Sequence, residues 1–421
     1  MGHLVGKDLY RKLGTKIDNL TMRAPWNDKF YAILKELYTS DEAFVAVMMP
    51  YGLSTIDKIE KATGFDRAKL GNILDSLSAK GLVLDIWIGG EYHYLLSPLV
   101  IGIFEFTMMR TGDNLNTKEW ARLFYDYMSG DDSFYKANFG AGQVTHPMRA
   151  LPHEEAITDS EHVEILDYEK ASAIIEMHGK FSIGFCSCRH EKSHFGLKKC
   201  EAPLETCSTF GDGADLMAKH GFARIVSKGE MLENIARSKE LGLVLCADNV
   251  KKDVGFICHC CGCCCNVLLG ISKFGYPNSI VTSSFVAHCD KDVCAECGDY
   301  VNACPINAIT IKADSPPEIN EVICIGCGVC SLKCATGAMS LVKRKQRVLH
   351  PDTMFERIIL QSLERGTLQN FMFTDTQRLT HKFMRGMVGG FLKLPPVKKA
   401  LMGDTLRSRF LGYMQKGVQG S

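Results

Sequence analysis

Cysteine occurs in this chain at a density that indicates metal binding. Residues 257–265 read ICHCCGCCC, and all 19 cysteines of the 421-residue chain lie between Cys186 and Cys334. Exposed free thiols at this density would oxidise, and adjacent cysteines strain a disulfide between them. Soft thiolate ligands select iron–sulfur clusters or zinc. The segment therefore predicts a metal centre built from Cys258, Cys260, Cys261, Cys263, Cys264 and Cys265.

A more regular spacing follows in CIGCGVCSLKC, residues 324–334. Its four cysteines, Cys324, Cys327, Cys330 and Cys334, have the spacing C-x2-C-x2-C-x3-C, which is half of a bacterial-type ferredoxin motif. The close triple brings three thiolates to three corners of one cubane, and the fourth serves the neighbouring cluster. A zinc site would instead pair two C-x2-C knuckles. Gly326 and Gly328 suit a loop that wraps closely around sulfide.

The partner half-motif is CAECGDYVNACP, residues 294–305, with Tyr300 where the third cysteine is expected. With the preceding motif, it resembles the two-cluster bacterial ferredoxin domain over about residues 283–343. The resemblance implies a complete cluster II on Cys304, Cys324, Cys327 and Cys330. It implies a cluster I on Cys294, Cys297 and Cys334 that lacks one ligand.

Cys289, five residues before Cys294, is the candidate substitute for the missing ligand. The alternatives are a three-iron cluster, a non-cysteine ligand such as Asp299, or a Cys289 that is only a free thiol. The spacing does not decide between them.

An earlier group of four cysteines, Cys186, Cys188, Cys200 and Cys207, has the spacing C-x-C-x11-C-x6-C. Four such thiols can close one tetrahedral site or ligate one cubane. Alternate residues of an extended segment face opposite sides, so the six thiols of ICHCCGCCC reach one metal only through a sharp turn, which Gly262 allows. Some of them therefore face a cluster and some face away. They either complete the Cys186 site or form a further cluster, with structural zinc as the alternative.

Two further residues near these cysteines receive separate interpretations. Cys246 is interpreted as a small buried residue of a strand in GLVLCADN. His190 is the one histidine that we single out as a ligand or a donor to one.

The middle region has two family resemblances. ICHCCGCCC is similar to the CCG cysteine pairs of heterodisulfide-reductase-type subunits, although the surrounding spacing departs from them. CSCRH, CEAPLETC and FICHCCGCCC, joined to a ferredoxin domain, resemble uncharacterised cytoplasmic iron–sulfur proteins of anaerobes. That resemblance implies electron transfer and no particular substrate.

The N-terminal region is predicted to be a winged-helix-like domain. A short helix with Ser54 as its cap, a second helix opened by Asp66, and a hairpin turning at Gly89-Gly90 follow in that order. This arrangement serves either DNA binding or protein docking. The second helix has little basic excess, which argues against DNA.

The C-terminal region is predicted to be a basic helical extension. Residues 377–421 contain nine Lys or Arg and one acid, Asp404. A solvated face is the ordinary explanation. The alternative is a docking arm for an acidic redox partner or an anionic membrane surface.

Composition and motifs limit the possible partners, cofactors and cellular location. The net charge is +1, so nucleic acid is not an obvious partner, and no run of about 18 apolar residues predicts a membrane span. The N-terminus lacks the apolar core of an export signal, which favours the cytoplasm. No glycine motif predicts a flavin, nicotinamide or nucleotide site.

These observations predict a multidomain α+β protein. The expected domains are 1–110 (winged-helix-like), 111–148 (helical linker), 149–282 (cysteine-rich), 283–343 (two-cluster ferredoxin) and 344–421 (basic extension). The predicted function is electron transfer to or from a partner oxidoreductase through several [4Fe–4S] clusters, two in the ferredoxin domain and one or two in the middle domain. The alternatives are a redox- or iron-responsive winged-helix regulator and a reductase with a catalytic central cluster.

Overall fold

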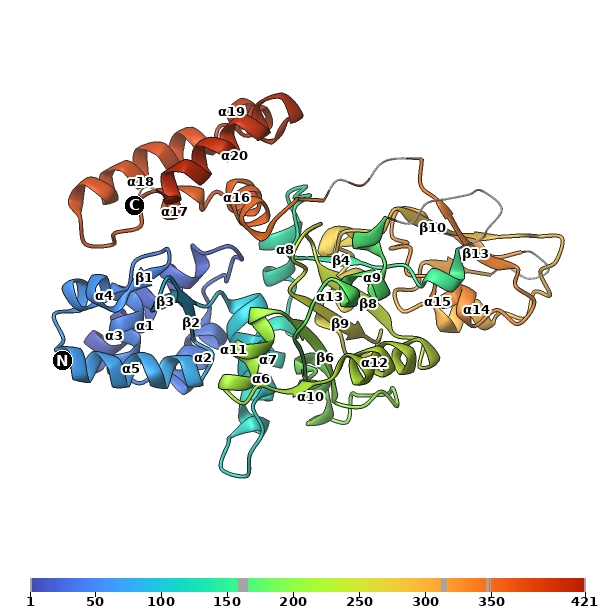
Figure 1. Cartoon of the computed structure of the whole chain (residues 1–421), viewed down its shortest axis with the longest axis horizontal. Coiled ribbons are helices and arrows are strands. Elements are labelled where there is room, and N and C mark those ends of the chain that lie inside the picture. Colours follow the sequence, from blue (N-terminus) through green and yellow to red (C-terminus); the bar gives the residue numbers. More distant parts are fainter. Residues whose placement is uncertain (1, 158–165, 312–315, 346–347, 349, 420–421) are drawn as a thin grey trace. The chain divides into compact units, whose positions relative to one another are not determined.

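The computed structural model describes residues 2–157, 166–311, 316–345, 348 and 350–419 (Figure 1). The described residues form a mixed α+β structure with open sheets, as predicted. The chain divides into two compact units, which we call the terminal unit (1–106 and 354–421) and the central unit (107–353). None of the described helices is both long enough and apolar enough to cross a membrane.

The N-terminal part of the terminal unit consists of helices and a small antiparallel sheet. Its elements are α1 (Gly2–Asp18), α2 (Asp28–Leu37), α3 (Ser40–Met48), β1 (Ser54–Thr55), α4 (Ile56–Thr63), α5 (Arg67–Ala79), β2 (Val83–Ile88), β3 (Glu91–Leu96) and a π-helical turn η1 (Leu99–Ile103). Asp66 caps α5 by accepting a hydrogen bond at 2.9 Å, and β2 pairs with β3 across Gly89-Gly90, both as predicted. The predicted cap at Ser54 is wrong, because Ser54 pairs within β1 and Thr55 precedes α4.

Helices from the C-terminal end complete the terminal unit. They are α16 (Met354–Arg365), α17 (Leu368–Met372), α18 (Leu379–Leu392), α19 (Pro395–Met402) and α20 (Asp404–Gln419). The Asn370 side chain donates to the Asn19 carbonyl at 3.0 Å, and the Tyr51 amide donates to the Thr374 carbonyl at 3.1 Å. Residues from both ends of the chain thus pack together, and the finer domain boundaries stay predictions.

A six-stranded antiparallel sheet forms the centre of the central unit, in the order β4-β8-β9-β6-β5-β7. The strands are β4 (Met148–Ala150), β5 (Phe181–Phe185), β6 (Glu205–Phe210), β7 (Ala223–Val226), β8 (Val244–Asp248) and β9 (Phe256–Cys260). One face carries an apolar core of residues such as Ile183, Leu245 and Ile257, which packs against α9 (Ala171–Glu176) and α12 (Lys228–Glu240). The opposite face is therefore free to carry different side chains.

Helices surround this sheet and precede it in the chain. They are α6 (Phe104–Met109), α7 (Thr117–Ser129), α8 (Ser133–Phe139), α9 (Ala171–Glu176), α10 (Ser187–Ser193), α11 (Asp212–Lys219), α12 (Lys228–Glu240) and α13 (Asn266–Ser272), with short 3₁₀ helices η2 (Glu154–Ala156), η4 (Asp167–Glu169) and η5 (Pro277–Ser279). Helix α6 spans the boundary between the two units.

The last part of the central unit repeats a short pattern twice. Its elements are β10 (Phe285–Cys289), α14 (Asp299–Ala303), β11 (Ile309–Thr310), β12 (Glu318–Ile319), α15 (Val329–Leu332) and β13 (Met339–Lys343). Strand β10 pairs with β13, and β11 pairs with β12. Each short helix begins after a glycine with positive φ, Gly298 or Gly328, so the two half-motifs share one local geometry.

Candidate metal centres

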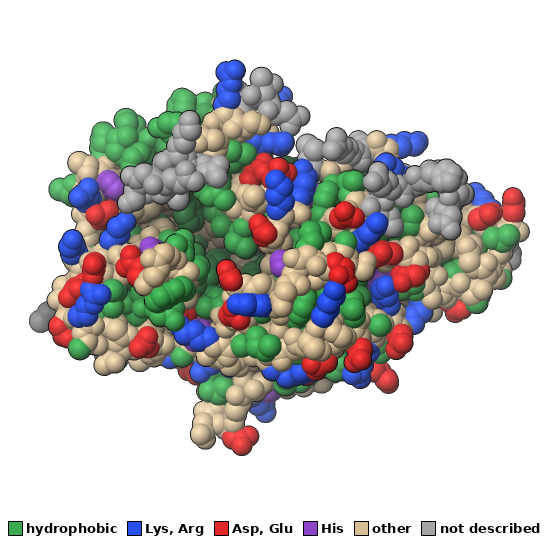
Figure 2. Space-filling view, viewed as in Figure 1, with side chains coloured by type: hydrophobic (Ala, Val, Ile, Leu, Met, Phe, Trp, Pro, Cys, Tyr) green, Lys and Arg blue, Asp and Glu red, His purple; other side chains and the backbone are tan. Residues whose placement is uncertain are grey.

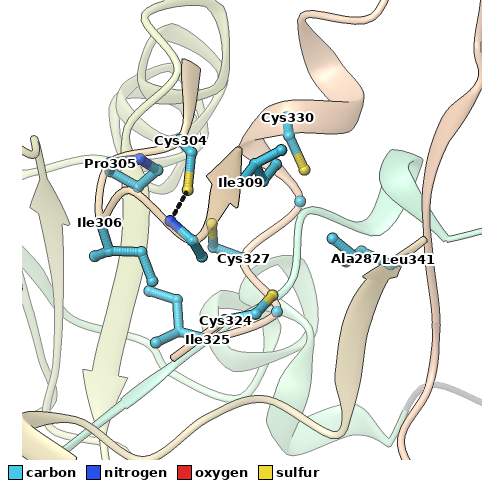
Figure 3. A pocket seen from close by; sticks show the side chains of 13 residues that line it. Ala287, Cys304, Pro305, Ile306, Ile309, Cys324, Ile325, Cys327, Cys330 and Leu341 are labelled. Carbon is cyan, nitrogen blue, oxygen red and sulfur yellow. Dashed lines mark hydrogen bonds between the residues drawn. The ribbon is translucent and has the colours of Figure 1, made fainter. Parts of the chain in front are cut away.

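Four cysteines from the two half-motifs surround one cavity, and we call them set II. They are Cys304, Cys324, Cys327 and Cys330. Their thiols point toward a shared space that Ile306, Ile309, Ile325 and Leu341 also line (Figure 3). This convergence of four separate thiols on an apolar cavity fits a cluster in which each thiolate binds a different iron.

The backbone around set II is positioned by two glycines. Gly326 and Gly328 have φ of +67° and +82°, where a side chain is strained. A Cβ on Gly326 would lie 2.1 Å from the Phe285 carbonyl oxygen, and one on Gly328 would lie 2.6 Å from the Ala156 Cβ. The close packing at these two positions therefore leaves no room for a side chain.

The surroundings of set II control the ionisation of its thiols. Burial raises the pKa of Cys304 and Cys327 and raises the pKa of Cys330 to about 12. The Ala308 amide donates a hydrogen bond to the Cys304 sulfur at 3.2 Å (Figure 3). Because burial opposes the thiolate form, ligation by these residues requires compensation by metal charge.

The remaining cysteines of the half-motifs and Cys289 form a second set, which we call set I and which lies near Tyr300. They are Cys289, Cys294, Cys297 and Cys334. Cys289 ends β10 and lies within thiol contact of Cys294, and burial together with Cys294 raises its pKa to about 11. Tyr300 is 1% exposed and lies beside Cys294; burial followed by the charge of Cys294 raises its pKa to about 12.

Cys334 also belongs to this neighbourhood, because its charge raises the pKa of Cys289. Burial disfavours its own thiolate, but hydrogen bonds from the Met339 amide and from Thr336 outweigh burial and lower the pKa of Cys334. Cys297 is exposed, so set I is more open to solvent than set II. The structure thus brings Cys289 beside Cys294, whereas its ligation stays a proposal.

A third set, the four-thiol group, comprises Cys200, Cys261, Cys263 and Cys264. The four sulfur atoms all lie within 4.8 Å of one another. The Cys200–Cys261, Cys261–Cys263 and Cys263–Cys264 sulfur distances are 3.4, 3.7 and 3.4 Å. Hydrogen bonds from Cys261 and Cys264 lower the pKa of Cys200, whereas pairing with Cys200 raises the pKa of both partners.

The seven other cysteines form the sheet-face group on the side of the sheet away from its apolar core. They are Cys186, Cys188, Cys207, Cys246, Cys258, Cys260 and Cys265. Cys246 is paired with Cys258 across β8 and β9, and the register of β6 on β9 places Cys207 opposite Cys258 on the other side. Three neighbouring strands thus present a row of thiols, and Cys260 lies two residues further on the same face.

Loops at the ends of strands complete the sheet-face group. Cys186 directly follows β5, Cys188 lies in the first turn of α10, and Cys265 precedes α13. The thiol of Cys188 interacts with Cys265, and the thiol of Cys265 interacts with Cys260. Burial raises the pKa of Cys186 to about 12, so thiolates in this group also require positive charge nearby.

Arg189 supplies positive charge between the four-thiol group and the sheet-face group. Its side chain is fully buried and donates a hydrogen bond to Thr206 Oγ1 at 2.8 Å, with further bonds to the carbonyls of Pro203 and His259. Burial lowers its pKa, but thiolates of both groups, led by Cys186, outweigh burial and raise it. A fully buried guanidinium thus interacts with thiols of both groups.

The central cysteines are grouped differently from their sequence order. Among the described residues, Cys186, Cys188 and Cys207 do not gather with Cys200 into one compact four-thiol site, because Cys200 lies with cysteines of ICHCCGCCC. The ICHCCGCCC segment contributes cysteines to the four-thiol group and to the sheet-face group, in line with the expectation that its thiols face different sides. Cys246 is fully buried in β8, as predicted. Its thiol also lies beside Cys260, and its register opposite Cys258 is visible only in the sheet. His190 Nδ1 lies 2.7 Å from the Met108 carbonyl oxygen, so this nitrogen is engaged by the backbone.

Set II lies against the central sheet. The His153 amide donates to the Cys327 carbonyl at 3.0 Å, and a Cβ on Gly262 would lie 2.5 Å from the Pro305 carbonyl oxygen. The charge of Cys327 also raises the pKa of Cys246. The sheet-face group and set II are therefore electrostatic neighbours inside one compact unit.

Comparison with known proteins supports the class of protein that these thiols indicate. A segment of 79 residues is 32% identical to hydrogenase-4 component A of Escherichia coli, covering 18% of this chain and 35% of that protein. Two uncharacterized ferredoxins of Methanocaldococcus jannaschii are 34% and 31% identical over 92 and 97 residues, or 20% and 23% of this chain and 49% and 56% of those proteins. The chain thus spans about half or less of these relatives.

No protein-family model and no solved structure matches the chain. The ferredoxin similarities and the gathered cysteines together indicate an iron–sulfur protein.

Proposed function

We propose that this protein is a cytoplasmic carrier that passes low-potential electrons through several iron–sulfur clusters to or from a partner oxidoreductase. Set II would hold a [4Fe–4S] cluster, set I would hold a second cluster with Cys289 as its fourth thiolate, and the sheet-face group would hold at least one more. Such clusters supply one-electron transfer. The observation that carries the proposal is the convergence of four half-motif cysteines on one buried cavity.

The arrangement of the three groups supports passage of electrons through the central unit. Set I includes the exposed Cys297, set II is largely buried, and set II contacts the sheet that carries the third group. A partner would thus exchange electrons at set I, and the buried groups would be shielded from solvent. The fold sets the order of the three cysteine groups and their burial, and Arg189 provides compensating positive charge.

Anaerobically purified full-length protein tests this proposal. We expect iron and acid-labile sulfide in similar amounts and EPR signals from more than one cluster after reduction by a low-potential donor. Protein that folds without iron or sulfide under reconstitution would refute it. Turnover of a small substrate at the cluster of the sheet-face group would favour the reductase alternative.

The regulator alternative is disfavoured by the ion pairs of α5. Arg67 is paired with Asp57, Lys69 Nζ lies 2.8 Å from Asp41, and Lys80 Nζ lies 2.7 Å from Glu42. The basic groups of this helix are thus engaged by carboxylates, which weakens attraction to phosphate. We expect no sequence-specific DNA binding; a footprint that survives physiological salt and shifts with cluster oxidation would promote the regulator.

The C-terminal helices offer a docking surface for the redox partner. Apolar side chains gather over the region of α18 (Figure 2), where Leu379, Phe383, Met387 and Phe391 are all more than half exposed at four-residue spacing. The exposed Arg378, Lys382 and Lys393 accompany them. This combination fits a partner with an acidic, partly apolar face. Retention of the protein by anionic vesicles, and loss of retention in Phe383→Ser, would assign the surface to a membrane instead.

A further inference from the structure

The thiols of this protein show two different spacings. The sulfur atoms of the four-thiol group all lie within 4.8 Å of one another, and among the described residues it is the one set of cysteines so compact. Set II surrounds a cavity instead, with its thiols on the rim of a shared space. The same chain therefore contains one set of thiols shaped for a large group and one shaped for a small one.

Ligand geometry distinguishes the two cases. With Zn–S bonds of about 2.3 Å, the sulfur atoms of a tetrahedral site lie about 3.8 Å apart. In a cubane the thiolates bind different irons at separate corners, which keeps them further apart. The three sulfur distances of 3.4 to 3.7 Å therefore match a single tetrahedral ion.

The local backbone produces this compact arrangement. The amides of Cys264 and Cys265 donate to the Cys261 carbonyl at 3.4 and 3.1 Å, which closes a tight turn after β9. Cys261, Cys263 and Cys264 come from that turn, and Cys200 approaches from the loop between α10 and β6. Cys264 is fully buried and Cys261 is 7% exposed, whereas Cys200 and Cys263 are partly exposed, so the group lies half-buried at the edge of the sheet.

We propose that Cys200, Cys261, Cys263 and Cys264 bind one structural zinc ion and that this site is separate from the electron-carrying clusters. Four thiolates and no further ligand make a closed, redox-inactive site. A site of this geometry binds Zn²⁺ more tightly than Fe²⁺. The formal charge of −2 left on a zinc tetrathiolate is offset by Arg189, which interacts with Cys261 and Cys200.

The ion would fix the turn that packs against the first ferredoxin half-motif. Gly262 lies inside the zinc-bound turn, and a Cβ there would lie 3.0 Å from Pro305 Cα. Pro305 directly follows Cys304 of set II. Zinc would therefore order a turn that contacts the backbone next to set II, without carrying electrons itself.

Metal analysis of anaerobically purified full-length protein tests the zinc site. We expect about one zinc per chain besides the iron, and a zinc X-ray absorption spectrum with four sulfur neighbours at about 2.3 Å and no iron in the next shell. This measurement needs no variant. If the protein held zinc but no iron, the proposed electron-transfer function would fail and the zinc proposal would stand.

A matched pair of variants separates the two kinds of site. Cys200→Ser should lower bound zinc at least tenfold and leave iron, sulfide and EPR signals unchanged. Cys258→Ser, in the sheet-face group, should lower iron and leave zinc unchanged. Loss of iron and sulfide in Cys200→Ser, or a single sulfide-free iron at this site in the wild-type protein, would overturn the assignment.

Discussion

The two half-motifs of the ferredoxin segment share a backbone and differ in their ligands. Glu296 has φ of +52° at the position equivalent to Gly326, and Asn307 has φ of +57° at the position equivalent to Gly337, at +72°. The same turns thus form with or without glycine. In the first half, however, Tyr300 replaces the third cysteine, and Cys289 comes from the preceding strand to stand beside Cys294.

The halves also differ in what covers them. Gly326 and Gly328 pack against Phe285 and Ala156, whereas a Cβ on Gly298 would meet nothing within 4 Å. The second half is therefore built into the central unit, and the first half is more open. This contrast teaches that one local motif can be packed tightly or left more open, because the tertiary contacts around the motif differ.

The largest expected effect is the loss of the cluster that set II would bind. Cys327→Ser should remove about four irons per chain and one EPR signal, because a buried ligand of a complete cluster is lost. Cys297→Ser, at the equivalent position of the other half, is the matched variant and should affect a different signal. Iron analysis and EPR of both variants check this, and identical spectra for the two would contradict separate clusters.

The second prediction concerns the substitute ligand. Cys289→Ala should convert the set I cluster to a three-iron form or destroy it, because only three thiolates would remain, and the set II signal should persist. EPR of the oxidised protein detects a three-iron product. An unchanged spectrum would show that Cys289 is a bystander and that another ligand, such as Asp299, serves the site.

The third prediction reverses that change. Tyr300→Cys in the Cys289→Ala background should restore a four-iron signal, because it returns a thiol to the position that the repeated motif provides. Tyr300→Phe in the same background is the control and should restore nothing. If both double variants behave alike, Tyr300 does not occupy a ligand position.

The smallest expected effect is a difference in stability between alanine variants of Gly298 and Gly328, two glycines with nearly the same φ. Gly298→Ala should cost about 1 kcal/mol, the strain of a left-handed alanine. Gly328→Ala should cost a further ~1–3 kcal/mol, because its Cβ meets Ala156. Unfolding midpoints measured anaerobically for the two variants test the difference, and equal midpoints would argue against tight packing of the second half.

The sequence by itself determined the local elements and the chemistry. The cap of Asp66 on α5 and the hairpin turn at Gly89-Gly90 form as predicted, and GLVLCADN contains the fully buried strand β8. The spacing of Cys324, Cys327 and Cys330 indicated an iron–sulfur protein, as the ferredoxin similarities support. Such signals are readable because capping, burial and chelation depend on residues close together in the chain.

Only the tertiary structure decided which distant thiols meet. Cys200 joins the turn after β9, Cys246 joins the sheet-face group through its register with Cys258, and Cys289 reaches Cys294 from the end of β10. Strand order places β8 and β6 on either side of β9, and nothing in the local spacing encodes that order. Partners that are far apart in sequence are set by the packing of whole elements, so their grouping required the fold.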